Sequence, residues 1–274
     1  MPAPNEITPT QLMRLLGTNN APALYDVCID DDFAQDPRLI PTAQRHPHTD
    51  LATLGAQIGA HIGAQPVVIV CQKGKKLSQG VAAYLRTQGI TAEYLQGGNY
   101  AWRDAGLPLV PAAKIPAQVN GATLWVTRHR PKIDRIACPW LIRRFIDPKA
   151  RFLYVAPDSV TDVAEKFGAT PFDIEGCDWG HVGALCTFDA MLAGFSLGTK
   201  PLLHLAKVIR AADTNDHGLA PESAGLLAFS VGLSRAYKDD LMQLEAGLPL
   251  YDALYRWARD GVNEGHDATR ETAP

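Results

Sequence analysis

The feature that most constrains this fold is a strand, a short loop and a helix around Cys71. The run Val67–Val70 is apolar and β-branched throughout, which is typical of a strand buried on both faces of a parallel sheet. The loop 71–76 follows, and the amphipathic stretch 78–86 predicts a helix. Because open α/β sheets bind ligands at the carboxyl edge of their strands, the pattern predicts that Cys71 lies at a binding edge.

The loop surrounds the Cys71 sulfur with hydrogen-bond donors and positive charge. We expect the loop amides and the helix N-terminus to converge on the sulfur, a setting that favours the nucleophilic thiolate and binds anions. Cys71 is therefore the predicted catalytic residue. The residues expected to bind the substrate are Gln72, Lys73, Gly74, Lys75 and Lys76.

The flanking segments resemble a known family. The strand Ala92–Leu95 and the segment Gly97–Trp102, taken with the Cys71 loop, resemble the carboxyl half of a rhodanese, or sulfurtransferase, domain. Upstream, Leu24–Val27 resembles the first core strand of that family, with Cys28 where arginine is common. The resemblance covers roughly residues 5–110 and implies a parallel sheet with flanking helices and a persulfide on the cysteine.

Two other interpretations of Cys71 are open. A cysteine after a β-branched run is commonly a small buried hydrophobic residue, but such a residue would not need a glycine and three lysines before a helix. A phosphatase also uses a cysteine in an anion-binding loop. Its loop is longer and ends in an arginine that binds phosphate bidentately, whereas this loop has only lysines, which favours sulfur transfer.

Composition limits the classes of protein to which this chain can belong. The chain has 274 residues, 46% hydrophobic content and a net charge of −3, which predicts a soluble, globular protein. No apolar run approaches membrane-spanning length, and residues 1–6 lack a signal segment. The five cysteines are irregularly spaced, which argues against a disulfide framework and favours a reducing cytoplasm.

We expect two domains. Residues 1–110 form the α/β rhodanese-like domain, a Pro/Ala-rich linker occupies 111–121, a mainly helical domain with a few strands spans 122–260, and 261–274 form a flexible tail. In the second domain, 122–127 and 152–155 are predicted strands, and a helix is expected to begin at Pro139. The further helices are expected at 158–167, 187–194, 200–212, 222–236 and 239–259, the last broken near Pro249.

The second domain has its own resemblance. Its motifs Trp125–Arg128, Lys132–Asp147, Pro171–Asp173 and Cys186–Asp189, with His181, resemble the carboxyl-terminal domain of the chromate-resistance protein B family. This implies an association with chromate resistance and, in some relatives, gene regulation. Relatives often carry a histidine ahead of the aspartate that matches Asp213, where this chain has Arg210.

The charged residues of this domain suggest two kinds of site. Arginine binds tetrahedral anions well, and the candidates are Arg128, Arg135, Arg143 and Arg144. The alternative is that these arginines pair with acids of the following helices. A divalent metal is also an option, with His181, Asp189, Asp213 and Glu222 as ligand candidates, although their spacing is not diagnostic. Cys138 is expected either at a helix N-terminus, with a lowered pKa, or packed in the core.

These patterns predict a sulfurtransferase that moves sulfane sulfur from thiosulfate or a similar anionic donor, through a Cys71 persulfide, to a thiol or cyanide acceptor. The reaction needs no cofactor, and the protein is linked to chromate resistance. The alternative is a chromate- or metal-responsive regulator or binding protein without turnover. Binding to membranes is not expected. Binding to nucleic acid is disfavoured because the total charge is acidic and no helix-turn-helix pattern is evident.

Overall fold

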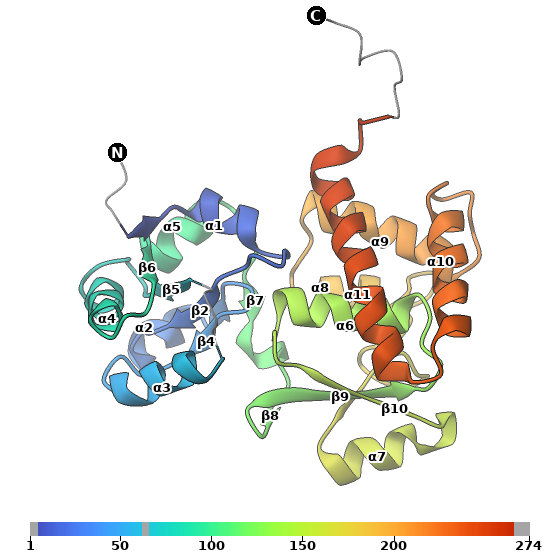
Figure 1. The fold of residues 1–274 in the computed structure, drawn as a ribbon, viewed down its shortest axis with the longest axis horizontal. Coiled ribbons are helices and arrows are strands. Elements are labelled where there is room, and N and C mark those ends of the chain that lie inside the picture. Colours follow the sequence, from blue (N-terminus) through green and yellow to red (C-terminus); the bar gives the residue numbers. More distant parts are fainter. Residues whose placement is uncertain (1–4, 62–65, 266–274) are drawn as a thin grey trace, which may run out of the picture.

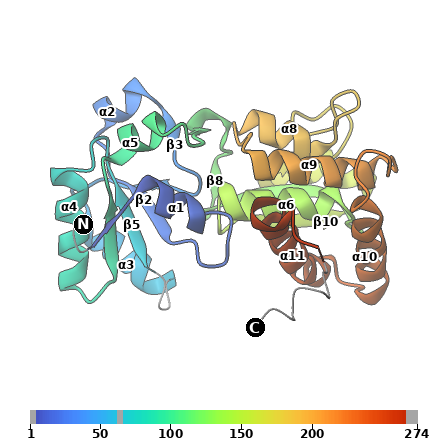
Figure 2. The same ribbon diagram turned by 90° about the horizontal axis from the view of Figure 1, so that it is seen from above.

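The computed structural model describes residues 5–61 and 66–265, which form two α/β units side by side (Figures 1 and 2). The N-terminal unit contains a five-stranded sheet, and the C-terminal unit contains a four-stranded sheet beneath a group of helices. The predicted fold class is thereby confirmed. Most of the predicted tail 261–274 lies outside the described residues. No helix in the described ranges is both long and apolar enough to cross a membrane.

The main sheet of the N-terminal unit is parallel throughout, in the order β1-β6-β5-β2-β4. Its strands are β1 (Glu6–Ile7), β2 (Ala23–Asp26), β4 (Gln44–Arg45), β5 (Val67–Val70) and β6 (Ala92–Leu95). The helices are α1 (Pro9–Leu15), α2 (Asp30–Gln35), α3 (Leu51–His61), α4 (Lys76–Thr87) and α5 (Gly98–Asp104). β5 is the central strand and is fully buried. Its residues alternate between a core with α1 and α5 and a core with α3 and α4.

The C-terminal unit follows a short antiparallel pair, β3 (Arg38–Leu39) with β7 (Val110–Pro111). In its sheet, β9 (Ala122–Arg128) runs parallel to β10 (Arg151–Val155) and β11 (Thr170–Pro171), and antiparallel to β8 (Gln118–Val119). The helices are α6 (Asp134–Phe145), α7 (Val160–Phe167), α8 (Thr187–Gly194), α9 (Lys200–Asp213), α10 (Ser223–Ala236) and α11 (Asp240–Arg256). Short helical turns occupy Ala112–Lys114, Pro157–Ser159 and Trp257–Gly261.

The buried side chain of Trp140, on α6, is a hub of the C-terminal core. Its ring contacts the rings of Phe145, Phe188, Tyr251 and Tyr255, with centroids 5.5–6.4 Å apart. The indole nitrogen of Trp140 also donates to Asp252 at 2.8 Å. Aromatic packing of this kind adds to the stability gained from burial alone. It fixes α6 against α8 and α11.

The structure corrects the predicted start of the helix that contains Pro139. α6 begins at Asp134, so Pro139 lies inside the helix and not at its N-terminus. A proline within a helix offers no N–H to the carbonyl four residues earlier, which here belongs to Arg135. The hydroxyl of Tyr154 donates to that carbonyl at 2.9 Å and replaces the missing bond.

Two further predictions about the chain path change. α11 continues through Pro249, where a break was expected. Pro249 is exposed, so water can solvate the carbonyl that loses its helical partner. The segment 111–121, expected to be a linker, contributes to β7, a helical turn and β8.

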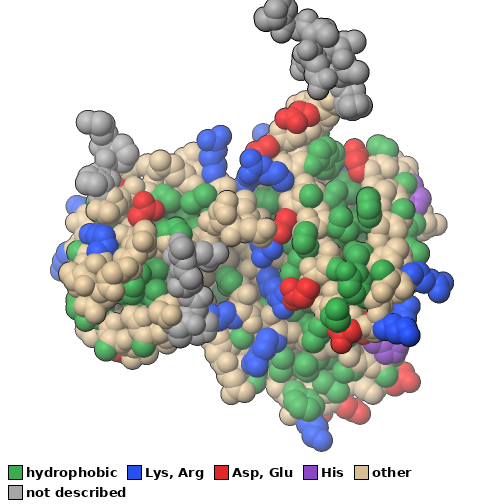
Figure 3. Space-filling view, viewed as in Figure 1, with side chains coloured by type: hydrophobic (Ala, Val, Ile, Leu, Met, Phe, Trp, Pro, Cys, Tyr) green, Lys and Arg blue, Asp and Glu red, His purple; other side chains and the backbone are tan. Residues whose placement is uncertain are grey.

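The two units are in direct contact. The amide of Thr42 donates to the carbonyl of Phe145 at 3.0 Å, and Arg144 donates to Asn19 at 2.8 Å. Gly17 has a φ of 73°, and a Cβ there would lie 2.4 Å from the ring of Phe145, so both conformation and space require glycine. Basic side chains gather along this boundary (Figure 3). Lys149 lines a cavity of about 420 Å³ between the units.

The bond from Tyr154 to the helix is testable. Tyr154→Phe should lower the free energy of unfolding by about 1–2 kcal/mol, because the Arg135 carbonyl loses its donor. In a Pro139→Ala background the amide of residue 139 can donate instead, so the same change should cost less. A double-mutant cycle measured by urea unfolding tests this, and equal losses in both backgrounds would contradict the explanation.

Candidate functional site

Cys71 lies directly after the central strand β5. Its Sγ is 3.1 Å from Oγ of Ser78, in the first turn of α4. The strand, loop and helix predicted around this cysteine are all present, and the helix begins at Lys76. The side chain of Cys71 is only 4% exposed, so the sulfur is enclosed between the loop and the helix.

The loop 71–75 uses its carbonyl groups and leaves its amides available. The carbonyls of Cys71 and Gln72 accept from the amides of Asn99 and Tyr100 at 3.0 and 3.1 Å. Within the part of the chain that the structure describes, the amides of residues 72–75 donate to no protein acceptor. Consecutive free amides beside a helix N-terminus form an anion-binding arrangement.

Two glycines permit this arrangement. Gly98, at the start of α5, has a φ of 62°, and a Cβ there would lie 2.0 Å from the carbonyl oxygen of Cys71. Gly74 also has a φ of 62°, and its Cβ would lie 2.5 Å from the carbonyl oxygen of Leu95. Left-handed conformation and close backbone contact together exclude any other residue at these positions.

The predicted substrate-binding side chains have different surroundings. Gln72 is buried. Its side-chain nitrogen Nε2 donates to Oε1 of Gln35 at 3.3 Å, which holds the loop against α2. Lys73, Lys75 and Lys76 are exposed, and none forms an ion pair with a described residue. The lysines can therefore attract an anion to the loop, whose backbone amides are available to bind it.

The pKa values of three other cysteines distinguish them from a nucleophile. Burial, with the charge of Asp26, raises the pKa of Cys28, which lines a cavity of about 190 Å³ beside the loop. Burial also raises the pKa of Cys138 and of Cys186. Cys138 lies inside α6 and is packed in the core, so the structure matches the second of its two expected placements and not the one at a helix N-terminus. All three remain protonated at neutral pH.

The four arginines predicted to bind an anion are paired with carboxylates. Arg143 contacts Glu245 at 2.6 Å, and Arg144 contacts Asp252 at 2.8 Å, both acids of α11. Arg128 and Arg135 both contact Asp173, at 3.0 and 3.3 Å. The arrangement matches the alternative in which the arginines pair with acids, and it divides the four residues between two places.

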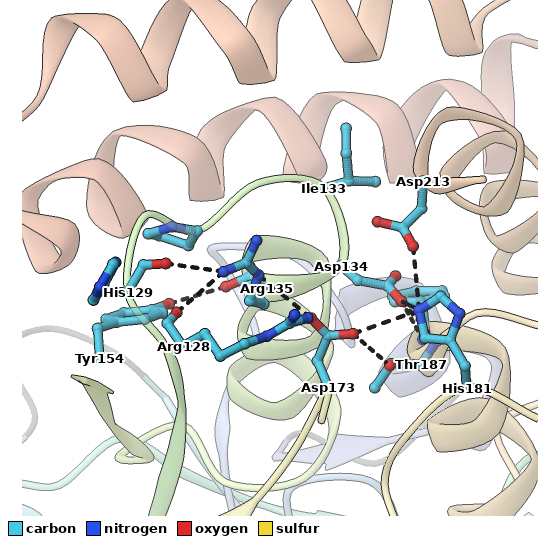
Figure 4. A network of polar contacts seen from close by, with 12 residues as sticks. Arg128, His129, Ile133, Asp134, Arg135, Tyr154, Asp173, His181, Thr187 and Asp213 are labelled. Atoms are coloured by element: carbon cyan, nitrogen blue, oxygen red, sulfur yellow. Dashed lines mark hydrogen bonds and ion pairs between the residues drawn. The ribbon is translucent and has the colours of Figure 1, made fainter. Parts of the chain in front are cut away.

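A second polar cluster lies where Asp173 meets the start of α6 (Figure 4). Nε2 of His181 is 3.3 Å from Asp213, 3.5 Å from Asp173 and 3.7 Å from Asp134. Asp134 is the first residue of α6, Asp173 follows β11, and Asp213 ends α9. Asp134, Asp173 and His181 each offer one ligand atom within 4.8 Å of the others, the spacing of a metal site.

The backbone and electrostatics of this cluster are unusual. Burial, with the nearby charges of Asp213 and Asp173, raises the pKa of Asp134 well above its ordinary value. Burial and the charge of Asp173 also raise the pKa of Asp213. Ile133 and Asp173 have φ values of 39° and 53°, which are strained for residues other than glycine. Buried like charges and backbone strain often occur together at functional sites.

Comparisons with known proteins place the C-terminal unit in a family. Residues 125–258 match the family model described as ChrB, C-terminal domain. This match identifies residues 125–258 as a ChrB C-terminal domain. Protein ChrB of Cupriavidus metallidurans is 37% identical over 142 residues, which are 51% of this chain and 42% of that protein. The matched region thus spans less than half the length of this curated relative.

The N-terminal unit is similar to solved rhodanese-like structures. A rhodanese-like domain protein from Staphylococcus aureus is 28% identical and covers 36% of this chain and 90% of its own, with a TM-score of 0.30. Thiosulfate sulfurtransferase from Pseudomonas aeruginosa is 26% identical and covers 39% of this chain and 19% of its own, with a TM-score of 0.32.

The ChrB C-terminal domain brings together two of the four residues predicted as metal ligands. His181 and Asp213 are in the cluster, whereas Asp189 contacts Arg210 at 3.0 Å and Glu222 is exposed at the start of α10. The sequence interpretation did not count Asp134 and Asp173 as ligands. Both belong to the family motifs, and Asp173 follows a parallel strand, which is the signal that could have identified it.

The close contact between Gly98 and the Cys71 loop can be tested with a matched pair of glycine-to-alanine variants. Gly98→Ala should destabilise the protein by about 2–4 kcal/mol, from the left-handed conformation and a backbone collision. Gly106 has a similar φ of 66°, but a Cβ there would have nothing within 4 Å, so Gly106→Ala should cost only about 1–2 kcal/mol. Denaturant unfolding measures both, and equal losses would contradict the role of Gly98.

Proposed function

We propose that this chain is a rhodanese-type sulfurtransferase in which Cys71 carries the transferred sulfur. The observation that supports this most is the Cys71 loop. The amides of residues 72–75 donate to no acceptor among the described residues, and the Cys71 sulfur contacts Ser78 in the first turn of α4. The free amides can stabilise both the thiolate and an anionic sulfur adduct, because charge is stabilised best by donors that are already oriented.

The proposed reaction has two displacement steps. The thiolate of Cys71 attacks the outer sulfur of thiosulfate, the sulfur–sulfur bond of thiosulfate breaks, and sulfite leaves with the bonding electrons. The enzyme then holds a persulfide. A thiolate or cyanide acceptor attacks the terminal sulfur, which gives a new persulfide or thiocyanate and restores the Cys71 thiolate. The cycle needs no cofactor, and a reducing compartment such as the cytoplasm would keep the thiol available.

The ChrB C-terminal domain suggests the setting of this chemistry. We propose that it links sulfur transfer to chromate resistance, as the family resemblance implies. The second candidate function is a metal-responsive binding protein or regulator without turnover, and the cluster around His181 supports it. Direct DNA binding is less well supported, because the four candidate arginines already contact carboxylates.

The nucleophile is tested by substitution. Cys71→Ser should reduce thiosulfate:cyanide sulfur transfer to background, since a serine hydroxyl neither ionises at neutral pH nor forms a persulfide. Cys28→Ser and Cys186→Ser should largely retain activity, because the raised pKa of each thiol keeps it protonated. Mass spectrometry after thiosulfate treatment should find one extra sulfur on Cys71. Finding it on another cysteine would reject the assignment, and full activity in Cys71→Ser would reject this mechanism.

The loop lysines are tested by kinetics. Replacing Lys73, Lys75 and Lys76 with glutamine should raise the donor KM on the order of tenfold at low salt and weaken its salt dependence, because exposed charges act by screened attraction. Lys166→Gln, an exposed change on α7 of the other unit, is the control. An unchanged KM at low salt would show that the amides alone bind the donor.

A further inference from the structure

The acidic cluster of the ChrB C-terminal domain has too little positive charge of its own. Asp173 is matched by Arg128 and Arg135. Asp134 and Asp213, however, have only the imidazole of His181 within ion-pair distance in the described part of the chain. A single ring nitrogen cannot donate to three carboxylates at once. The three carboxylates therefore lie around one ring nitrogen, and the positive groups of the protein balance their negative charge only in part.

The burial and hydrogen bonding of the Asp134 carboxylate independently indicate that the cluster binds a ligand. Its side chain is 1% exposed, and its Oδ2 accepts from the amides of Thr187 and Phe188 at 2.6 and 3.4 Å. Its Oδ1 is buried and has no hydrogen-bond partner among residues 5–61 and 66–265. In Figure 4 the carboxylate faces His181, toward the centre of the cluster. The oxygen nearest His181 is Oδ2, at 3.7 Å, and Oδ1 belongs to the same carboxylate. Because buried carboxylate oxygens nearly always have a partner, an unpaired oxygen on a carboxylate that faces this cluster indicates a partner that comes from solution.

The surroundings hold these groups as a metal site requires. The hydroxyl of Thr187 donates to Asp173 Oδ1 at 2.9 Å, while Arg128 and Arg135 contact Oδ2 of the same carboxylate. Such outer contacts fix the orientation of a ligand. His181 is 45% exposed and the side chain of Asp213 is 20% exposed, so the cluster opens to solvent on their side. An ion can enter there and keep water or another small ligand in its remaining positions.

We propose that one divalent transition-metal cation binds to Asp134, Asp173 and His181, whose ligand atoms lie within 4.8 Å of one another, with Asp213 beside His181 as the fourth ligand. Three carboxylates and one imidazole form an oxygen-rich set suited to Mn²⁺, Fe²⁺ or Zn²⁺, and the imidazole favours these ions over Mg²⁺ and Ca²⁺. Asp189 is left out of the site because it pairs with Arg210, and Glu222 is left out because it is exposed at the start of α10. The site is separate from Cys71 and does not depend on sulfur transfer.

The test uses the full-length chain, stripped with chelator and titrated separately with Mn²⁺, Zn²⁺ and Mg²⁺ by isothermal calorimetry. Wild type should bind one Mn²⁺ or Zn²⁺ per chain and prefer both to Mg²⁺. His181→Ala and Asp213→Asn should each weaken the Kd by about 10- to 100-fold. Glu222→Gln, an exposed carboxylate change in the same unit, should bind as wild type does.

Asp134→Asn keeps the shape of the side chain and separates folding from binding. The metal-free variant should be at least as heat-stable as the metal-free wild type, because a buried charge is removed. The rise in Tm that Mn²⁺ or Zn²⁺ gives the wild type should be lost. No saturable binding to wild type, or an unchanged Kd in His181→Ala and Asp213→Asn, would overturn the proposal, whatever the outcome of the sulfur-transfer assays.

Discussion

The contact between the loop after β5 and the first turn of α5 is the constraint on which the Cys71 site depends. β5 delivers the cysteine to the edge of the sheet, but α5 decides how the loop faces. The amides of Asn99 and Tyr100 donate to the loop carbonyls at 3.0 and 3.1 Å, while the loop amides 72–75 donate to no acceptor in the described part of the chain. Only glycine at positions 74 and 98 lets the two backbones approach this closely. The proposed chemistry at the sulfur would therefore depend on backbone atoms of the loop as well as on the cysteine itself.

In the ChrB C-terminal domain, the arrangement of the polar cluster depends on the buried carboxylate of Asp134. Asp134 is the first residue of α6 and accepts from the amides at the start of α8, so one carboxylate lies near two helix N-termini. The strained backbone at Ile133 is held on both sides, since its amide donates to Ser230 at 3.0 Å and its carbonyl accepts from Tyr251 at 2.9 Å. Strain of this kind persists only where the surroundings determine the conformation.

α6 connects the two halves of the structure. Its first residue, Asp134, belongs to the carboxylate cluster, and the carbonyl of its last residue, Phe145, accepts from Thr42 of the N-terminal unit. The aromatic packing around Trp140 fixes the middle of the same helix. The proposed metal site and the boundary with the N-terminal unit are thus attached to the same helix, although each can be studied separately.

The sequence by itself determined the elements whose signals are local. The β-branched run before Cys71 predicted the central strand, the following loop and amphipathic stretch predicted the helix, and the motifs around Trp125 and Cys186 predicted the family of the second half. These features follow from side-chain periodicity and turn chemistry, which act over a few residues. The helix at 187–194 was predicted to the residue for the same reason.

Only the tertiary structure decided which distant groups meet. The start of α6 was misplaced because the donor that compensates for Pro139 is Tyr154, on a strand later in the chain. The arginines of α6 looked available for anions until α11 supplied Glu245 and Asp252. Asp134, Asp173, His181 and Asp213 are widely separated in sequence and come together because a helix start, a strand end, a loop and a helix end converge. No spacing rule records such a convergence, since it depends on how whole elements pack.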